Sequence, residues 1–121
     1  MSAVGTFKVT VEIGDPQGQR WEAVETLVDT GASYSWVPAS ILQGLGVEPT
    51  IRFPFILADG RQIERDMAET QARLDGQVRT TLVVFGDEGT QPLLGSFTLE
   101  AFGLAADPVN GRLISVPGLL M

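Results

Sequence analysis

Apolar and polar side chains alternate strictly in residues 6–13, "TFKVTVEI". A period of two fits a half-buried β-strand and does not fit the face of an α-helix. The turn-forming stretch "GDPQGQ" follows, and alternation resumes from Arg20 in "RWEAVETLV". The two runs predict an antiparallel hairpin, which commits the start of the chain to a β fold.

The rest of the chain continues in short extended segments. Further strands are predicted at residues 50–57 ("TIRFPFIL"), 78–85 ("VRTTLVVF") and 111–116 ("GRLISV"). Pro54 cannot donate to a strand ladder, so the strand that contains it is expected at a sheet edge or at a bulge. The pairs Asp59-Gly60 and Asp75-Gly76 favour tight turns that join antiparallel strands.

Helical signals are weak and brief. The stretch "PASILQGLG" after Pro38 could form a short helical turn that ends at Gly44 or Gly46. A second short helix is predicted from Ser96 as N-cap to a stop at Gly103. Its helical spacing is carried by Phe97, Ala101 and Leu104. We therefore expect one all-β, mostly antiparallel domain over residues 1–121 with one short helix near its end.

Composition removes most kinds of catalytic site. The chain has no histidine and no cysteine, so Ser-His-Asp triads, Cys-His dyads and ordinary zinc sites are impossible. Lys8 is the only lysine, which makes lysine-based covalent catalysis improbable. We expect no metal and no cofactor. Any acid–base chemistry then falls to carboxylates.

Charge and hydropathy bound the partners. The net charge is −7 and the eight basic residues form no stripe, so nucleic acid is not expected as a partner. No apolar run approaches the roughly 18 residues of a membrane helix. The first residues lack the pattern of a signal peptide. Zero cysteines fit a reducing compartment, and we expect a cytoplasmic protein.

One carboxylate stands out in residues 26–38, "TLVDTGASYSWVP". An apolar run ends at Asp29 and breaks into a glycine turn. Taken alone, Asp29 could be a turn residue or an N-cap, because Asp and Gly are common in turns. Tyr34 and Trp36 are expected to pack in the protein rather than to bind a ligand.

A family resemblance extends this reading. "LVDTGA" followed later by "LLG" and a short helix resembles the retropepsin-like aspartic proteases, the small single-domain type. The resemblance implies a closed β-barrel with a flap hairpin and one short C-terminal helix. It implies that Asp29 is the catalytic carboxylate and that Thr30 makes hydrogen bonds between two subunits. Gly31 would let the backbone approach the carboxylate, and Ala32 completes the active-site loop.

Two further elements follow from the resemblance. Leu93, Leu94 and Gly95 match the segment that packs against the active-site loop. The flap would include Ala58, Asp59 and Gly60, by position and turn chemistry. The chain departs from many cellular relatives at Phe97, where the pattern G-x-D has an Asp, so the polar contact of that Asp is expected to be absent.

The chemistry requires two carboxylates. One must be ionised to take a proton from water, and the other protonated to donate to the carbonyl oxygen. Because the chain holds one D-T-G, a twofold homodimer would supply the second Asp29. The sequence thus predicts a homodimeric aspartic endopeptidase acting on an extended peptide. Ala32 offers no hydroxyl to the ionised pair, so we expect activity toward weakly acidic or neutral pH.

The alternative is a non-catalytic module of the same fold, used for dimerisation or protein binding, since fold does not fix function. The intact D-T-G-A sequence argues against it, because a binding module has no need of a carboxylate at that turn.

Overall fold

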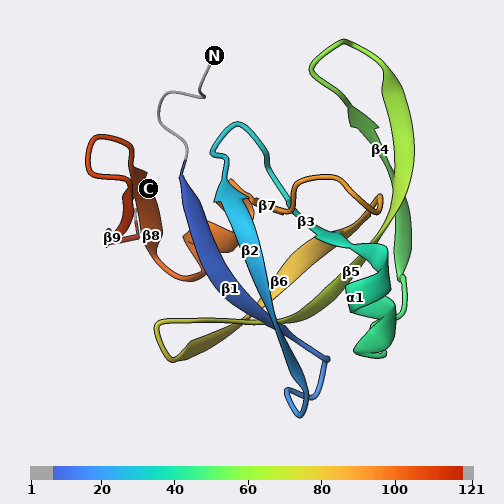
Figure 1. The fold of residues 1–121 in the computed structure, drawn as a ribbon, viewed down its shortest axis with the longest axis horizontal. Helices are drawn as coiled ribbons and strands as arrows, with labels where there is room; N and C mark the ends of the chain where they lie inside the picture. The colour runs from blue at the N-terminus through green and yellow to red at the C-terminus, as the bar shows by residue number, and fades with distance from the viewer. Residues whose placement is uncertain (1–6, 119–121) are drawn as a thin grey trace.

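The computed structural model describes residues 7–118, which form nine strands and two short helices (Figure 1). The strands are β1 (Lys8–Gly14), β2 (Trp21–Val28), β3 (Ser35–Pro38), β4 (Ile51–Ile56), β5 (Gln62–Leu74), β6 (Gln77–Gly86), β7 (Leu93–Leu94), β8 (Leu104–Asp107) and β9 (Arg112–Ser115). The helices are α1 (Ala39–Gly44) and α2 (Ser96–Ala101). The prediction of an all-β chain is confirmed, with α1 as the short helical turn expected after Pro38.

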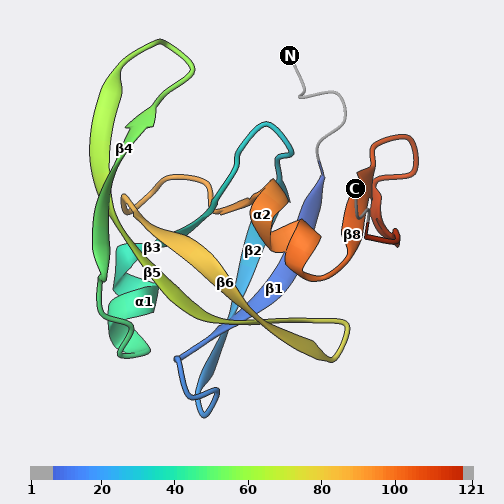
Figure 2. The same cartoon turned by 180° about the vertical axis from the view of Figure 1, so that it is seen from behind.

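Seven strands form one sheet in the order β1-β2-β7-β3-β6-β5-β4. An additional pairing joins β1 to β5 through Glu12↔Arg73 and Ile13↔Ala72, so six strands form a ring and the sheet closes on itself. β4 remains outside this ring and pairs only with β5 along the sheet order. The β4–β5 hairpin therefore extends beyond the body of the barrel, as Figures 1 and 2 show.

Local sequence signals place most of these strands correctly. β1 and β2 pair antiparallel over seven residue pairs, as the alternation predicts. Pro54 lies in β4, which is an edge strand of the sheet, in agreement with its missing N–H. The two Asp-Gly pairs form the β4–β5 and β5–β6 turns. Gly60 and Gly76 have φ of +88° and +76° there, values that glycine adopts at little cost.

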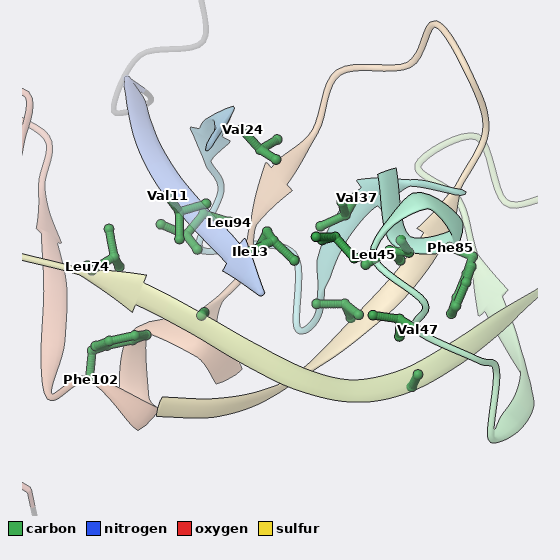
Figure 3. Close-up of a cluster of buried hydrophobic side chains, with 14 of the residues drawn as sticks. Val11, Ile13, Val24, Val37, Leu45, Val47, Leu74, Phe85, Leu94 and Phe102 are labelled. Atoms are coloured by element: carbon green, nitrogen blue, oxygen red, sulfur yellow. The ribbon is translucent and has the colours of Figure 1, made fainter. Parts of the chain in front are cut away.

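The barrel interior holds one apolar cluster (Figure 3). Val11 and Ile13 from β1 lie at most 2% exposed in it, opposite the polar side of the same strand. Leu42 of α1 and Leu45, which follows it, also belong to the cluster. The alternating pattern of β1 therefore marks the core directly.

The helix α2 differs in detail from its prediction. Its N-cap is Gly95, not Ser96, and its buried residues are Thr98 and Leu99. Phe97, the first of the residues at helical spacing, is 47% exposed and does not lie on the buried side of the helix. Leu104 belongs to β8, because Gly103 ends the helix with a φ of +64°.

Along residues 7–118, the structure contains no helix with the length and apolarity that a bilayer crossing demands. The prediction of a single domain over 1–121 stays a prediction at its ends, since residues 1–6 and 119–121 lie outside the described part.

Candidate active site

Asp29 directly follows β2, and backbone hydrogen bonds fix its position on both sides. Val28 N donates to Phe7 O at 2.8 Å, and Asp29 N donates to Leu94 O at 3.1 Å. β7 lies parallel to β2, with Leu93 opposite Leu27 and Leu94 opposite Val28. The segment that the sequence predicted to support the loop therefore contacts it directly.

The turn after Asp29 orients its carboxylate. Gly31 N donates to Asp29 Oδ1 at 3.0 Å, and Ala32 N donates to Asp29 O at 3.0 Å. A Cβ on residue 31 would stand 3.2 Å from that same Oδ1, tighter than an ordinary contact. Glycine therefore allows the close approach that the sequence predicted. Thr30 is exposed in the single chain, and its role between subunits stays a prediction.

Gly95 lies directly beneath the loop. A Cβ there would stand 2.6 Å from Tyr34 C, 2.7 Å from Tyr34 O and 3.0 Å from Ala32 O, so no side chain fits. The next two amides donate to the loop: Ser96 N to Ala32 O and Phe97 N to Ser33 O, both at 2.9 Å. The carbonyl groups of the loop thus accept hydrogen bonds from the N–H groups at the start of α2, where no side chain provides a cap.

A chain of buried hydroxyls lies behind this junction, and sequence reasoning missed it. Gly95 N donates to Ser35 Oγ at 3.0 Å. Ser35 Oγ lies 2.6 Å from Thr98 Oγ1, and Thr98 Oγ1 lies 2.8 Å from Thr81 Oγ1. All three side chains are at most 3% exposed. The available signal was polar residues inside apolar strands, Ser35 in "SWVP" and Thr81 in "TTLVVF".

A cleft of about 690 Å³ opens above Asp29. One side is the loop and the start of β3, and the other is β4 with the residues that follow it. The lining residues are Asp29, Gly31, Ala32, Ser33, Tyr34, Trp36, Pro54, Phe55, Ile56, Leu57, Ala58 and Leu93. Asp29 is the only carboxylate among them. Of the three predicted flap residues, Ala58 reaches the cleft, while Asp59 and Gly60 belong to the hairpin turn beyond it.

Aromatic rings join the hairpin to the loop. Phe55 of β4 contacts Trp36 edge-on, with ring centroids 5.5 Å apart, and Tyr34 at 6.1 Å. Phe53 lies 6.1 Å from Tyr34. The ring of Phe97 lies tilted against that of Tyr34, with centroids 5.9 Å apart. At the position where the G-x-D pattern has an Asp, this chain therefore makes an aromatic contact. Tyr34 and Trp36 pack against other aromatic rings, as predicted. Both also line the cleft, so the prediction that they do not bind a ligand stays a prediction.

One ion pair joins the hairpin, near its root, to the residue that follows β6. Arg65 of β5 donates two hydrogen bonds to Asp87, at 2.9 and 2.7 Å, and they hold the pKa of Asp87 below its usual value. At the tip, the backbone N–H and the guanidinium of Arg61 lower the pKa of Asp59. In the described part of the chain no group of His, Cys, Asp or Glu residues could hold a metal ion.

A single chain therefore offers one oriented carboxylate facing a mainly apolar cleft. Gly31 N–H holds Oδ1, and Asp29 Oδ2 has no hydrogen-bond partner among residues 7–118. Such a group can accept or donate one proton to a ligand in the cleft. It cannot alone provide both an ionised and a protonated carboxyl group.

Two solved structures that resemble this chain in fold are retroviral proteases. The simian foamy virus (mac) protease in solution shares 17% identity, with 77% of this chain and 91% of that chain covered at a TM-score of 0.55. The EIAV protease in complex with the inhibitor HBY-793 shares 19% identity, with 85% and 93% covered at a TM-score of 0.57. No protein-family model and no curated protein sequence matches the chain. At these identities the likeness establishes a retropepsin-like fold.

Proposed function

We propose that this chain, which has the retropepsin-like fold, is a homodimeric aspartic endopeptidase in which each subunit contributes Asp29. The observation that carries the proposal is the carboxylate itself. It lies on the floor of a peptide-sized cleft, with one oxygen held by Gly31 N–H at 3.0 Å. A carboxylate whose only role was to stabilise the turn would not need to line a cleft.

A second subunit is needed because the reaction requires one ionised and one protonated carboxyl group. In the proposed dimer, a water molecule gives a proton to the ionised Asp29, and the oxygen of that water attacks the carbonyl carbon of the peptide bond. The protonated Asp29 of the other subunit donates its proton to the carbonyl oxygen. On collapse, the first Asp29 passes its proton to the leaving nitrogen and the C–N bond breaks. The second takes a proton from the diol, so the pair again holds one shared proton.

The cleft walls suggest the kind of substrate. Apolar residues dominate both sides, with Trp36 and Leu93 on the floor side and Phe55 and Ile56 on the hairpin side. We infer that an extended peptide with apolar side chains next to the scissile bond binds there. The β4–β5 hairpin serves as the flap in this proposal and excludes water when it closes over the peptide.

The direct test is Asp29→Asn, which keeps the shape of the side chain and removes its acid–base chemistry. The matched control is Asp75→Asn. Asp75 is an exposed turn residue at a φ of +50°, a conformation that Asn also tolerates, so both variants change charge equally.

Both variants and the unmutated chain are assayed on casein and on a library of peptides. We expect cleavage by the unmutated chain and by Asp75→Asn, and loss of at least about 10³-fold in kcat for Asp29→Asn. Equal cleavage by all three would remove the proposed mechanism. Absence of cleavage by all three would favour the non-catalytic binding module.

Sedimentation provides a companion measurement. We expect a monomer–dimer equilibrium in the concentration range where cleavage is seen, with specific activity rising as dimer forms. A strict monomer with undiminished activity would contradict the shared site.

A further inference from the structure

The three buried hydroxyls of Ser35, Thr81 and Thr98 need a reason for being in the core. They come from β3, β6 and α2, and none is more than 3% exposed. Burying a hydroxyl is unfavourable unless it finds partners, and apolar residues of similar size would fill the same space at no such cost. The arrangement therefore points to a requirement for hydrogen bonding at this place.

That requirement is the amide of Gly95. β7 has only two residues, and Gly95 follows it immediately as the N-cap of α2. Its N–H accordingly lies between a strand and a helix and needs an acceptor inside the protein. Ser35 Oγ is that acceptor, at 3.0 Å.

Thr98 sets the position of this acceptor. Its Oγ1 lies 2.6 Å from Ser35 Oγ and 2.8 Å from Thr81 Oγ1, so it is the middle member of the chain. An oxygen–oxygen distance of 2.6 Å is comfortable for a hydrogen bond and far too short for a methyl group. The location of Ser35 Oγ thus depends on a hydroxyl at residue 98.

The consequences reach Asp29 through the backbone. Gly95, Ser96 and Phe97 present three successive amides to Ser35 Oγ, Ala32 O and Ser33 O. Ala32 N in turn donates to Asp29 O, and Asp29 N donates to Leu94 O. Any displacement of the β7–α2 junction is therefore passed to both sides of the catalytic turn.

We propose that Thr98 is a positioning residue for the active site, whose hydroxyl, linked to Ser35 and Thr81, locks the β7–α2 junction against the loop that holds Asp29. The catalytic part of this statement rests on the proposed function of Asp29. The positional part, order at Gly95 and Gly31, does not depend on activity. Thr98 directly follows Phe97, which stands where the G-x-D pattern has an Asp. Thr98 therefore supplies a polar contact one residue after that position.

The test uses Thr98→Val, which keeps the branched shape and removes the hydroxyl. Its methyl group displaces Ser35 Oγ from Gly95 N–H. The matched control is Thr70→Val. Thr70 is 1% exposed, and its hydroxyl bonds to Gly14 O, joining β5 to β1 in another part of the barrel. Thr98→Ser restores the hydroxyl without the methyl group.

Two readouts are taken on the full chain. In peptide cleavage, Thr98→Val should lower kcat about 10- to 100-fold with KM changed less than about threefold, because the turn that orients Asp29 is misplaced while the wall of the cleft formed by β4 remains. Thr98→Ser should return kcat to within about threefold. By NMR hydrogen exchange, Gly95 and Gly31 amides should exchange at least about tenfold faster in Thr98→Val and remain unchanged in Thr70→Val.

Ser35→Ala serves as a second variant if Thr98→Val does not fold, because it removes the acceptor without adding a clash. It should accelerate exchange at Gly95 in the same way. Unchanged exchange at Gly95 and Gly31, or equal effects of Thr98→Val and Thr70→Val on kcat, would overturn the proposal. Absence of any Asp29-dependent cleavage by the unmutated chain would instead overturn the proposed function, and the exchange data would still decide the positional claim.

Discussion

Substituting alanine for Gly95 tests how tightly the β7–α2 junction is packed against the loop that holds Asp29. The added Cβ would stand 2.6 Å from Tyr34 C, whereas ordinary contact begins at 3.4 Å. The two backbone segments must therefore separate by about 0.8 Å to reach ordinary contact. Because φ of residue 95 is −90°, alanine meets no conformational penalty, and the whole effect is steric.

The magnitude follows from what resists that shift. Overpacking a filled core costs about 1–3 kcal/mol. Here the contacting atoms are backbone, held by Gly95 N→Ser35 Oγ at 3.0 Å and Ser96 N→Ala32 O at 2.9 Å. We therefore expect Gly95→Ala to reduce the free energy of unfolding by about 3 kcal/mol, at the upper end of that range.

The assay is urea unfolding followed by tryptophan fluorescence, with Gly44→Ala as the control. Gly44 lies in α1, and a Cβ there would meet nothing within 4 Å. Alanine is the better helix former, so the control should gain about 0.5–1 kcal/mol. A Gly95→Ala variant within about 0.5 kcal/mol of the unmutated chain would refute the steric account of this junction.

Two further predictions concern substrate and pH. Phe55→Ala removes the ring contacts to Trp36 and Tyr34; a peptide library should then show a changed preference for apolar residues beside the scissile bond, and an unaltered preference would exclude Phe55 from the subsite. Backbone N–H groups of Arg20 and Gln19, both 2.7 Å from Asp15 Oδ1, lower the pKa of Asp15 in the folded chain. That stabilisation is fully present above the pKa of Asp in the unfolded state, about 4, and is lost as the pH falls through the lower pKa of folded Asp15. The urea concentration at the unfolding midpoint should therefore decrease as the pH is lowered from about 6 to about 3, and it should decrease less steeply in Asp15→Asn. An equal slope in both would contradict the assigned cause.

Much of the fold is readable because its signals are local. Alternation marks β1 and β2, and the glycines of the two Asp-Gly pairs mark the turns at both ends of β5 by their left-handed conformation. The long strand β5 itself was not assigned from sequence. Its inward positions include Ala68, Thr70 and Ala72, which are buried but too small or polar to give a clear apolar pattern.

Contacts between distant parts of the chain could not be read in this way. The parallel pairing of β2 with the two-residue β7 has no local signature; the family resemblance predicted only that residues 93–95 pack against the loop after β2. Ser35 and Thr98 are 63 residues apart and form one hydrogen bond in the core. Phe97 turned outward because the amides beginning α2 are fixed to loop carbonyls, a constraint that helical spacing alone does not contain.

The candidate site also has a part that the sequence predicted and a part that only the structure shows. Asp29, Gly31 and Gly95 were identified from sequence, and each now has a geometric reason: a cleft, a close approach and an excluded side chain. The aromatic contact of Phe55 with Trp36 required coordinates, because β4 and β3 lie far apart in the sheet order.

Subunit mixing tests the central claim, that one active site is shared by two copies of Asp29. Unmutated and Asp29→Asn chains are unfolded together in equal amounts and refolded, so that dimers form at random. If each site needs both carboxylates, activity per total protein should fall to about one quarter of the unmutated value, since only that share of dimers holds two intact copies. A fall to about one half would mean that each chain carries a complete site, and would contradict the account.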